Sequence, residues 1–117
     1  FRIVLNLYYT MCEYNDERIK FIEELVLKEY GMKKSDFVSE GKRCNSIQSQ
    51  ILDVIVFFLY DYERIPYKAI CHHYFGRSVA MMQRRRQRIM NLSKTKAKDE
   101  MLLQRIEKLK KQYKSLL

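Results

Sequence analysis

The sequence contains little of the material from which a chain makes turns. Its 117 residues include three glycines and one proline, whereas sandwiches and barrels of short strands need a turn about every 8–12 residues. A chain with so few turn residues is expected to consist of longer elements, which argues against the all-β classes. The composition therefore predicts an all-α domain.

The sequence also lacks a disulfide framework and a long hydrophobic run. Cys12, Cys44 and Cys71 are an odd number of cysteines without framework spacing, which predicts free thiols and a cytoplasmic location. The longest apolar run, residues 54–60, is much shorter than the about 20 residues of a membrane-spanning helix, and no signal peptide is recognisable. With 47% hydrophobic residues, we expect one folded domain over residues 1–117 and no membrane partner.

Negative charge is scarce in the second part of the chain. Residues 1–76 contain ten Lys and Arg and eleven Asp and Glu, whereas residues 77–117 contain thirteen and three. The whole net charge of +9 therefore arises after residue 76. This asymmetry is typical of proteins that bind a polyanion such as nucleic acid. The alternative is a solvated surface that charge merely keeps soluble.

Apolar residues recur at helical spacing through most of the chain. One amphipathic helix is expected to begin at Asn15 or Asp16, which can cap it, and to end at Gly31. Residues 1–14 have a mixed pattern that fits helix or strand, with helix favoured. Four further helices are predicted, the first of them apolar on most faces and therefore central, at about 46–62, 66–74, 78–92 and 98–116.

The most informative stretch is residues 66–92. Two predicted helices are joined here by a short segment around Gly76, and the second helix is strongly basic. This is the pattern of a helix-turn-helix. The arginines of the second helix are Arg84, Arg85, Arg86 and Arg88. Because they span little more than one turn, they cannot share one face, and we expect some to reach phosphates and others base edges.

We find no motif of an enzyme or of a metal site. Cys71, His72 and His73 are adjacent, but a zinc site needs four ligands with recognisable spacing, and neighbouring histidines point to different helix faces. No Gly-rich phosphate loop and no nucleophile-elbow motif occurs. We therefore expect no enzymatic activity, cofactor, metal or small-molecule substrate. A membrane-surface or calmodulin-target helix is a less favoured interpretation of the methionines among the arginines.

Several short segments also follow one another in a recognisable order. They are Tyr30, Gly31 and Met32; the basic loop Lys42-Arg43; residues 65–70; Tyr74, Phe75, Gly76 and Arg77; and Gln87, Arg88 and Ile89. In this order they resemble the C-terminal DNA-binding domain of the bacterial replication initiator DnaA, whose turn reads Phe-Gly-Gly-Arg and whose closing segment reads Arg-Lys-Ile. We assign residues 15–117 to the family-like region and residues 1–14 to an N-terminal extension.

The resemblance implies an all-helical helix-turn-helix module that binds double-stranded DNA. In the family the second helix lies in the major groove, and an arginine of the basic loop enters the minor groove. Carried over by position, Arg77 to Met81 would begin the recognition helix, and Lys42 and Arg43 would form the minor-groove or phosphate element. The residues predicted to contact DNA are Lys42, Arg43, Lys68, Arg77, Ser78, Val79, Ala80, Met81, Gln83, Arg84, Arg85, Arg86 and Arg88.

This chain departs from the family at the positions that read bases. The family's Asp-His-Thr triplet is Ser78-Val79-Ala80 here, so binding is expected to be salt-sensitive, with modest sequence preference or with reading by residues such as Gln83 and Arg84. No ATPase motif is present, so neither ATP binding nor origin melting is carried over.

Two further points remain open at the level of sequence. A small alanine of the family's recognition helix is Arg85 here, which predicts a snorkelling side chain or a slightly rotated helix. The second hypothesis for the function is a protein-interaction or oligomerisation module, favoured by the apolar Val79 and Met81 at the start of the helix. Its partner would be a larger replication or regulatory protein or a second copy of the chain.

Overall fold

The computed structural model of the chain describes residues 2–34, 46–74, 78–93 and 95–116, and the side chains of residues 2–14 and 46 are not described. This part of the chain is all-helical, which confirms the predicted class. The helices are α1 (Arg2–Tyr30), α2 (Ser46–Asp61), α3 (Tyr67–His73), α4 (Val79–Met90) and α5 (Ala97–Ser115). The helices predicted from residue 46 onward agree with α2 to α5 to within two residues at each end, as is usual for helix ends.

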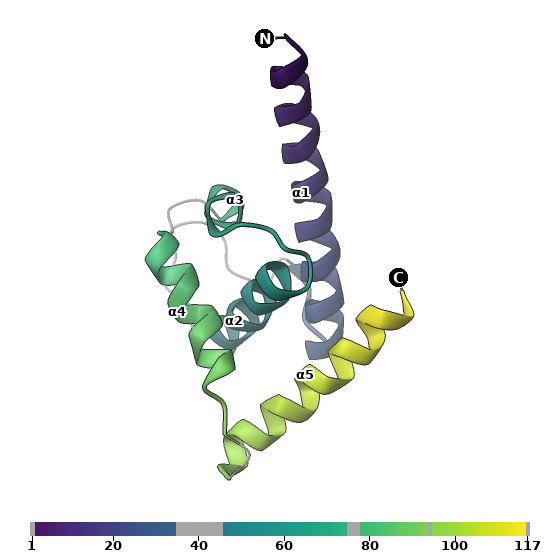
Figure 1. The fold of residues 1–117 in the computed structure, drawn as a ribbon. Coiled ribbons are helices and arrows are strands. Elements are labelled where there is room, and N and C mark those ends of the chain that lie inside the picture. The colour runs from purple at the N-terminus through teal and green to yellow at the C-terminus, as the bar shows by residue number, and fades with distance from the viewer. Residues whose placement is uncertain (1, 35–45, 75–77, 94, 117) are drawn as a thin grey trace.

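The helices are arranged around α2 (Figure 1). α2 lies between α1 and α4, with the short α3 beside its C-terminal end, while α5 packs across the C-terminal half of α1. The N-terminal half of α1 projects beyond the other helices. Residues far apart in the sequence therefore meet mainly on the surface of α2.

α1 corrects the prediction for the start of the chain. Residues 1–14 and the helix expected from Asn15 or Asp16 were predicted as separate segments, but one helix runs through both from Arg2 to Tyr30. Helix is confirmed for residues 2–14, and the predicted cap is wrong because Asn15 and Asp16 lie inside the helix. No Gly or Pro occurs between residues 1 and 30, and Asn or Asp in a helix interior costs only about 0.7 kcal/mol.

The end of α1 is at Gly31, as the sequence predicts. Gly31 has a φ of 64°, a left-handed conformation that glycine adopts without the strain of a side chain. Its N–H donates to the carbonyl of Lys28, and the N–H of Met32 donates to that of Leu27, at 3.1 and 3.0 Å. This pair of bonds is a Schellman motif, which satisfies carbonyls that a helix end otherwise leaves without partners.

The core is built on α2, which is buried at every position from residue 51 to residue 59. Each other helix contributes a stripe or a single side chain to it. α1 contributes Ile19, Ile22 and Val26; α3 contributes Ile70; α4 contributes Met82 and Ile89; and α5 contributes Ile106, Leu109 and Tyr113. The predicted central helix is thus the most buried one, because a helix that is apolar on most faces must be covered on most faces.

A buried ion pair fixes α4 against α2. Arg85 and Asp53 are only 7% exposed, and Arg85 Nη1 donates to Asp53 Oδ1 at 2.9 Å and to the main-chain oxygen and Oγ of Ser49. Burial raises the pKa of the Asp53 carboxyl, and the hydrogen bond and charge of Arg85 only partly offset that rise. The pair therefore adds little net stability, but losing one partner would leave the other charge buried.

The next arginine ties α4 to the end of α2. Arg86 donates through Nε and Nη2 to the two carboxylate oxygens of Asp61 at 2.7 and 2.9 Å. Its guanidinium also lies 5.0 Å from the ring centroid of Tyr60, and that ring stacks on Tyr67 of α3 with centroids 4.1 Å apart. Arg86 thereby links three helices, so the rotation of α4 about its own axis is fixed at two successive residues.

Replacing Arg85 by methionine is expected to lower the free energy of unfolding by about 3 kcal/mol. Without Arg85 the buried charge of Asp53 loses its main partner. Arg88, which lies 3.5 Å from Asp53 Oδ1, offsets part of the loss in stability. Urea denaturation measures the change.

The matched control is Arg84→Met, one residue earlier on the exposed side of the same helix. It is expected to change stability by less than about 0.5 kcal/mol. Replacing both members of the pair, Asp53→Leu with Arg85→Met, should recover most of the loss because no unpaired charge remains. Equal effects of Arg84→Met and Arg85→Met would contradict the structural role of the pair.

Candidate nucleic-acid interface

The orientation of α4 decides which of its side chains face the solvent. Met82, Arg85 and Ile89 are buried against the rest of the domain. On a helix the opposite side is then formed by residues 80, 83, 84, 87 and 88, and all five are exposed. We call Ala80, Gln83, Arg84, Gln87 and Arg88 the outer face of α4.

The polar side chains of the outer face are largely free to bind a ligand. In the described part of the chain, the side chains of Gln83 and Arg84 make no hydrogen bond or ion pair. The Arg88 side chain is 58% exposed and approaches Asp53 Oδ1 at 3.5 Å. Gln87 Nε2 donates to Asn91 Oδ1 at 2.9 Å, which orients both amides on the surface.

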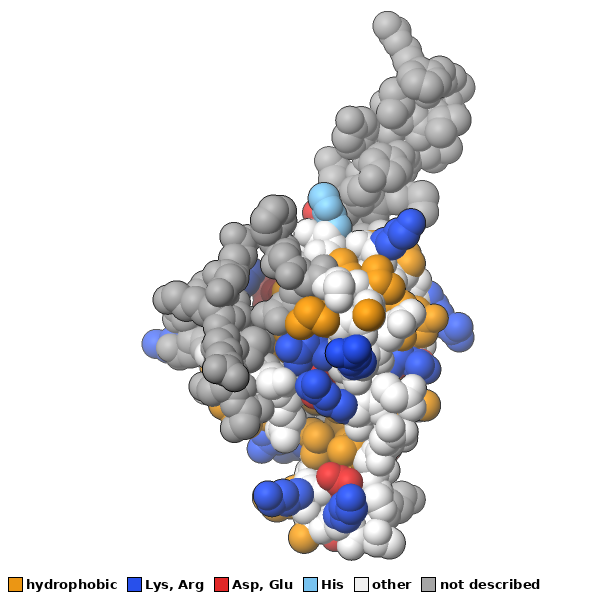
Figure 2. Space-filling model, turned by 90° about the vertical axis from the view of Figure 1, so that its left-hand side faces the viewer, with side chains coloured by type: hydrophobic (Ala, Val, Ile, Leu, Met, Phe, Trp, Pro, Cys, Tyr) orange, Lys and Arg blue, Asp and Glu red, His pale blue; other side chains and the backbone are white. Residues whose placement is uncertain are grey.

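The outer face is positively charged because the carboxylates on α2 are buried or paired with other arginines. α4 itself contains no Asp or Glu. Asp53 is buried beneath Arg85, and Asp61 is held by Arg86 with a quarter of its side chain exposed. Figure 2 views the molecule from the side that carries α4, and Lys and Arg side chains are spread over this face with little acidic surface between them.

The structure places the described residues that were predicted to contact DNA in three environments. Lys68, Ser78, Val79, Ala80, Met81, Gln83, Arg84 and Arg88 are exposed. Arg86 is partly exposed and paired with Asp61, and Arg85 is buried. Lys42, Arg43 and Arg77 lie outside the described residues. The exposed members therefore come from α3 and from the first and outer parts of α4.

Arg85 is the member of the predicted set that the structure removes from the surface. At 7% exposure, with its guanidinium held by Asp53 and Ser49, it cannot reach a duplex outside the domain. The sequence left two explanations for an arginine at this position, and a snorkelling side chain is not what the structure has. Its charge is neutralised inside the domain because α2 supplies a carboxylate opposite it.

Gln87 belongs to the outer face but was not among the predicted contact residues. In the sequence, Gln87 belongs to the closing segment of the family resemblance. Its spacing could have identified it, because residue 87 lies three positions after residue 84 and four after residue 83, which places all three on one side of a helix.

The first turn of α4 has both a polar and an apolar part. The Ser78 Oγ accepts a hydrogen bond from the Met81 N–H at 3.2 Å and caps the helix. Val79 and Met81 are 36% and 38% exposed. Because residues two apart do not face each other on a helix, these two apolar side chains lie on different flanks of α4 and form no continuous patch.

A cluster of charged groups joins α3 to α1 just before the segment that leads to α4. His73 Nδ1 lies 3.4 Å from Asp16 Oδ1, and its Nε2 lies 3.5 Å from Glu23 Oε1. The Tyr74 hydroxyl also donates to Glu23. The hydrogen bond with Glu23 raises the pKa of His73, burial opposes the rise, and the Glu23 and Asp16 charges add to it.

The pKa of Glu23 is shifted in the opposite direction, to a lower value. Burial alone would raise its pKa, but the hydrogen bonds from His73 and Tyr74, with the charges of His73 and Lys34, outweigh burial, and the pKa is lowered. The cluster therefore holds α3 most strongly when the imidazole is protonated and the carboxylate is ionised.

The stability that His73 contributes is expected to decrease as pH rises. A raised pKa in the folded state means that this contribution is complete below the ordinary value of 6.5 and is lost as pH rises through the higher folded value. The difference in unfolding free energy between the wild type and His73→Gln should therefore be larger at about pH 6 than at about pH 8.5. Urea denaturation at both pH values measures it.

His72→Gln is the control, because His72 is the exposed neighbour on the same helix. The difference in unfolding free energy between the wild type and His73→Gln could instead stay constant or grow as pH rises. That result would show that the two carboxylates do not hold an imidazolium.

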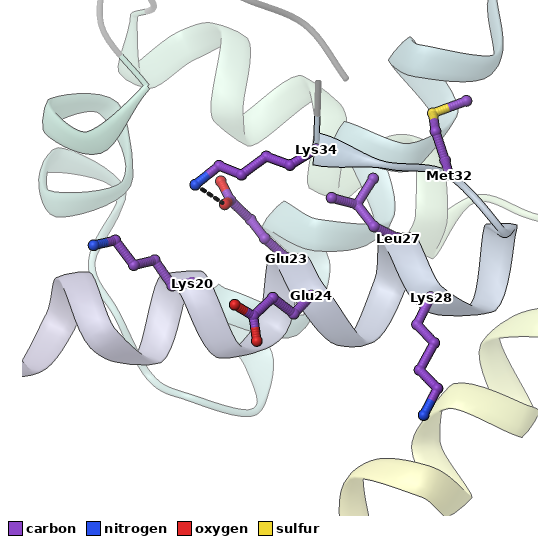
Figure 3. Close-up of a pocket in the computed structure, with 7 residues that line it drawn as sticks. All are labelled: Lys20, Glu23, Glu24, Leu27, Lys28, Met32 and Lys34. Carbon is purple, nitrogen blue, oxygen red and sulfur yellow. Dashed lines mark ion pairs between the residues drawn. The ribbon is translucent and has the colours of Figure 1, made fainter. Parts of the chain in front are cut away.

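A shallow pocket of about 210 Å³ lies beside this cluster on α1 (Figure 3). Glu23 Oε2 is buried there without a hydrogen-bond partner among the described residues, and the Lys34 ammonium lies 3.8 Å away. In the close-up Lys34 reaches back toward Glu23, while Glu24 and Lys28 point away from it. The charged groups among the described lining residues do not converge on one point, so they suggest no ligand, and the Lys34 ammonium partly balances the charge of Glu23.

Cys71 is a free, partly buried cysteine in α3. Burial raises the pKa of the Cys71 thiol, which makes it less nucleophilic. Within the described ranges no group of three or more His, Cys, Asp or Glu side chains could hold a metal ion. Among the same residues no helix is long and apolar enough to cross a membrane.

Comparisons with known proteins found no match: no protein family, no characterised protein and no solved structure corresponds to this chain. The resemblance to the DnaA family therefore rests on the short sequence segments alone. The outer face of α4 and its surroundings are the features that bear on a function.

Proposed function

We propose that this chain binds double-stranded DNA through the outer face of α4. The observation that carries the proposal is that this face displays Arg84 and Arg88 together with Gln83 and Gln87. The carboxylates of Asp53 and Asp61 are paired with arginines of the inner side. The outer face also lies in the part of the chain that contributes the whole positive net charge. Such a surface suits the phosphates and the base edges of a duplex.

The dimensions and the supports of α4 fit this role. An α-helix with its side chains is about 10–12 Å wide, close to the about 12 Å width of the major groove of B-DNA. The inner side of α4 is held by Arg85 and Arg86, so the outer face is presented at a fixed rotation. Lys68, exposed on the preceding helix, is suited to contact a phosphate beside the groove.

The second candidate function is a protein-interaction or oligomerisation module. Its supporting observation is the exposure of Val79 and Met81, at 36% and 38%. These side chains lie on different flanks of α4, however, and a protein interface is expected to have a continuous apolar centre. The observations therefore favour DNA.

Binding to labelled duplexes is expected to weaken steeply as salt rises, because lysines and arginines displace counterions from the phosphates. Arg84→Ala/Arg88→Ala should reduce the affinity by about 30-fold or more, since each contact of this kind contributes about 1–3 kcal/mol. Fluorescence anisotropy at two salt concentrations measures both effects.

The matched control is Lys111→Ala/Lys114→Ala, which removes the same charge from exposed positions near the C-terminal end of α5. It should change the affinity only slightly, and urea denaturation should show that both double variants are folded. Binding that is independent of salt, or an equal loss in the two double variants, would contradict the proposal.

Sedimentation separates the two candidate functions. The DNA-binding proposal predicts that the protein without DNA does not associate through α4, so Val79→Ser/Met81→Ser leaves its sedimentation coefficient unchanged. An oligomer that forms without DNA and dissociates in this variant would favour the interaction module.

A further inference from the structure

The outer face of α4 repeats one pair of side chains. Gln83 and Arg84 are followed, four residues later, by Gln87 and Arg88. At 1.5 Å per residue the two pairs are separated by about 6 Å along the helix, which corresponds to about two base-pair steps of 3.4 Å. Each level of the helix therefore offers one amide and one guanidinium to the same stretch of groove.

Both groups prefer purines to pyrimidines in the major groove. A guanidinium matches the O6 and N7 acceptors of guanine, and an amide matches the N6 donor and N7 acceptor of adenine. Both are purine edges in the major groove. Reading a cytosine requires an acceptor for its N4 amino group, which Asp and Glu provide best, and α4 contains neither.

The four side chains keep the hydrogen-bonding capacity that this reading needs. Gln83 and Arg84 have no partner in the described part of the chain. Gln87 uses one N–H on Asn91, which leaves its Oε1 acceptor and its second N–H available. Arg88 lies 3.5 Å from Asp53 with 58% of its side chain exposed.

We propose that α4 selects a short run of purines on one DNA strand, with Arg84 and Arg88 on guanine and Gln83 and Gln87 on adenine. This inference rests on the DNA binding proposed above and names the class of site that is bound. Ser78, whose Oγ caps the helix, and Val79 are not among these readers of sequence. Ala80, at the N-terminal end of the outer face, offers a methyl group that suits the methyl group of thymine.

The glutamines distinguish this proposal from general electrostatic binding. Arginines alone would bind phosphates or an acidic protein with little regard to sequence. If the protein bound only phosphates, a hydrogen bond from a neutral amide would merely replace one that the amide already makes to water, with little net gain in affinity. On an adenine edge the same amide makes two directed hydrogen bonds. The contribution of Gln83 and Gln87 should therefore depend on the sequence of the duplex.

The first step of the test is a selection of bound duplexes from a random pool with the wild-type chain, followed by titration of the selected duplex and of a scrambled one. The selected site is expected to contain adjacent guanine and adenine on one strand. Gln83→Ala and Gln87→Ala should each weaken binding to the selected duplex by at least about fivefold and leave binding to the scrambled duplex unchanged.

The second step assigns each contact to an atom. Replacing the adenine by 7-deazaadenine removes the N7 acceptor and should weaken binding of the wild-type protein. It should cause no further loss of affinity in the variant that lacks the glutamine assigned to that adenine. Gln87→Arg should change the preferred base at its position from adenine to guanine. A purely structural role of the glutamine predicts neither result.

The outcomes separate the inference from the function on which it rests. Failure to bind any duplex overturns DNA binding itself. Equal binding of all duplexes, a selected site without adjacent purines, or glutamine variants that lose affinity equally on both duplexes would overturn purine reading while DNA binding stands.

Discussion

The buried contact between Arg85 and Asp53 decides how α4 is presented. The apolar stripe of α4 consists of Met82 and Ile89, which is a narrow contact for a helix and would tolerate some rotation. A charge that must reach its partner across the interface tolerates much less, because a misplaced partner would leave a buried carboxylate unpaired. The bond of Arg86 to Asp61 fixes the same rotation at the next residue. The proposed binding surface thus depends on a contact inside the domain.

Most of the fold could be predicted because the apolar pattern is strong where the helices are buried. α2 is the clearest case, since it is apolar on most faces and is buried from residue 51 to residue 59. The division of α1 could not be predicted correctly, because Asn15 and Asp16 are good capping residues. A cap forms only where the backbone leaves the helix, and the sequence around these residues contains no glycine or proline to make it do so.

The stretch of sequence that contains the candidate site could be predicted, but not which of its side chains form the exposed surface. The charge pattern and the segment around Gly76 identified the basic helix. Which arginines face the solvent depends on what lies opposite each of them, and that is a property of the packing. Asp53, the one charged residue in the buried run 51–59 of α2, was the available clue, because a carboxylate in a buried helix requires a partner. Gln87 was missed although Gln83 was predicted, because its spacing from residues 83 and 84 indicates a shared face only once the exposed side of the helix is known.

The two sides of α4 separate folding from the proposed recognition. Among the described residues, the inner side carries the contacts that hold α4 against α2, whereas the outer face has only the approach of Arg88 to Asp53 and the bond of Gln87 to Asn91 within the same segment. Substitutions on the outer face therefore change what the surface offers to a ligand without altering the domain behind it. A lineage of such domains could acquire new target sites through a few exchanges at residues 80, 83, 84 and 87, with the same scaffold retained. The same separation makes α4 a suitable position for grafting a different recognition surface.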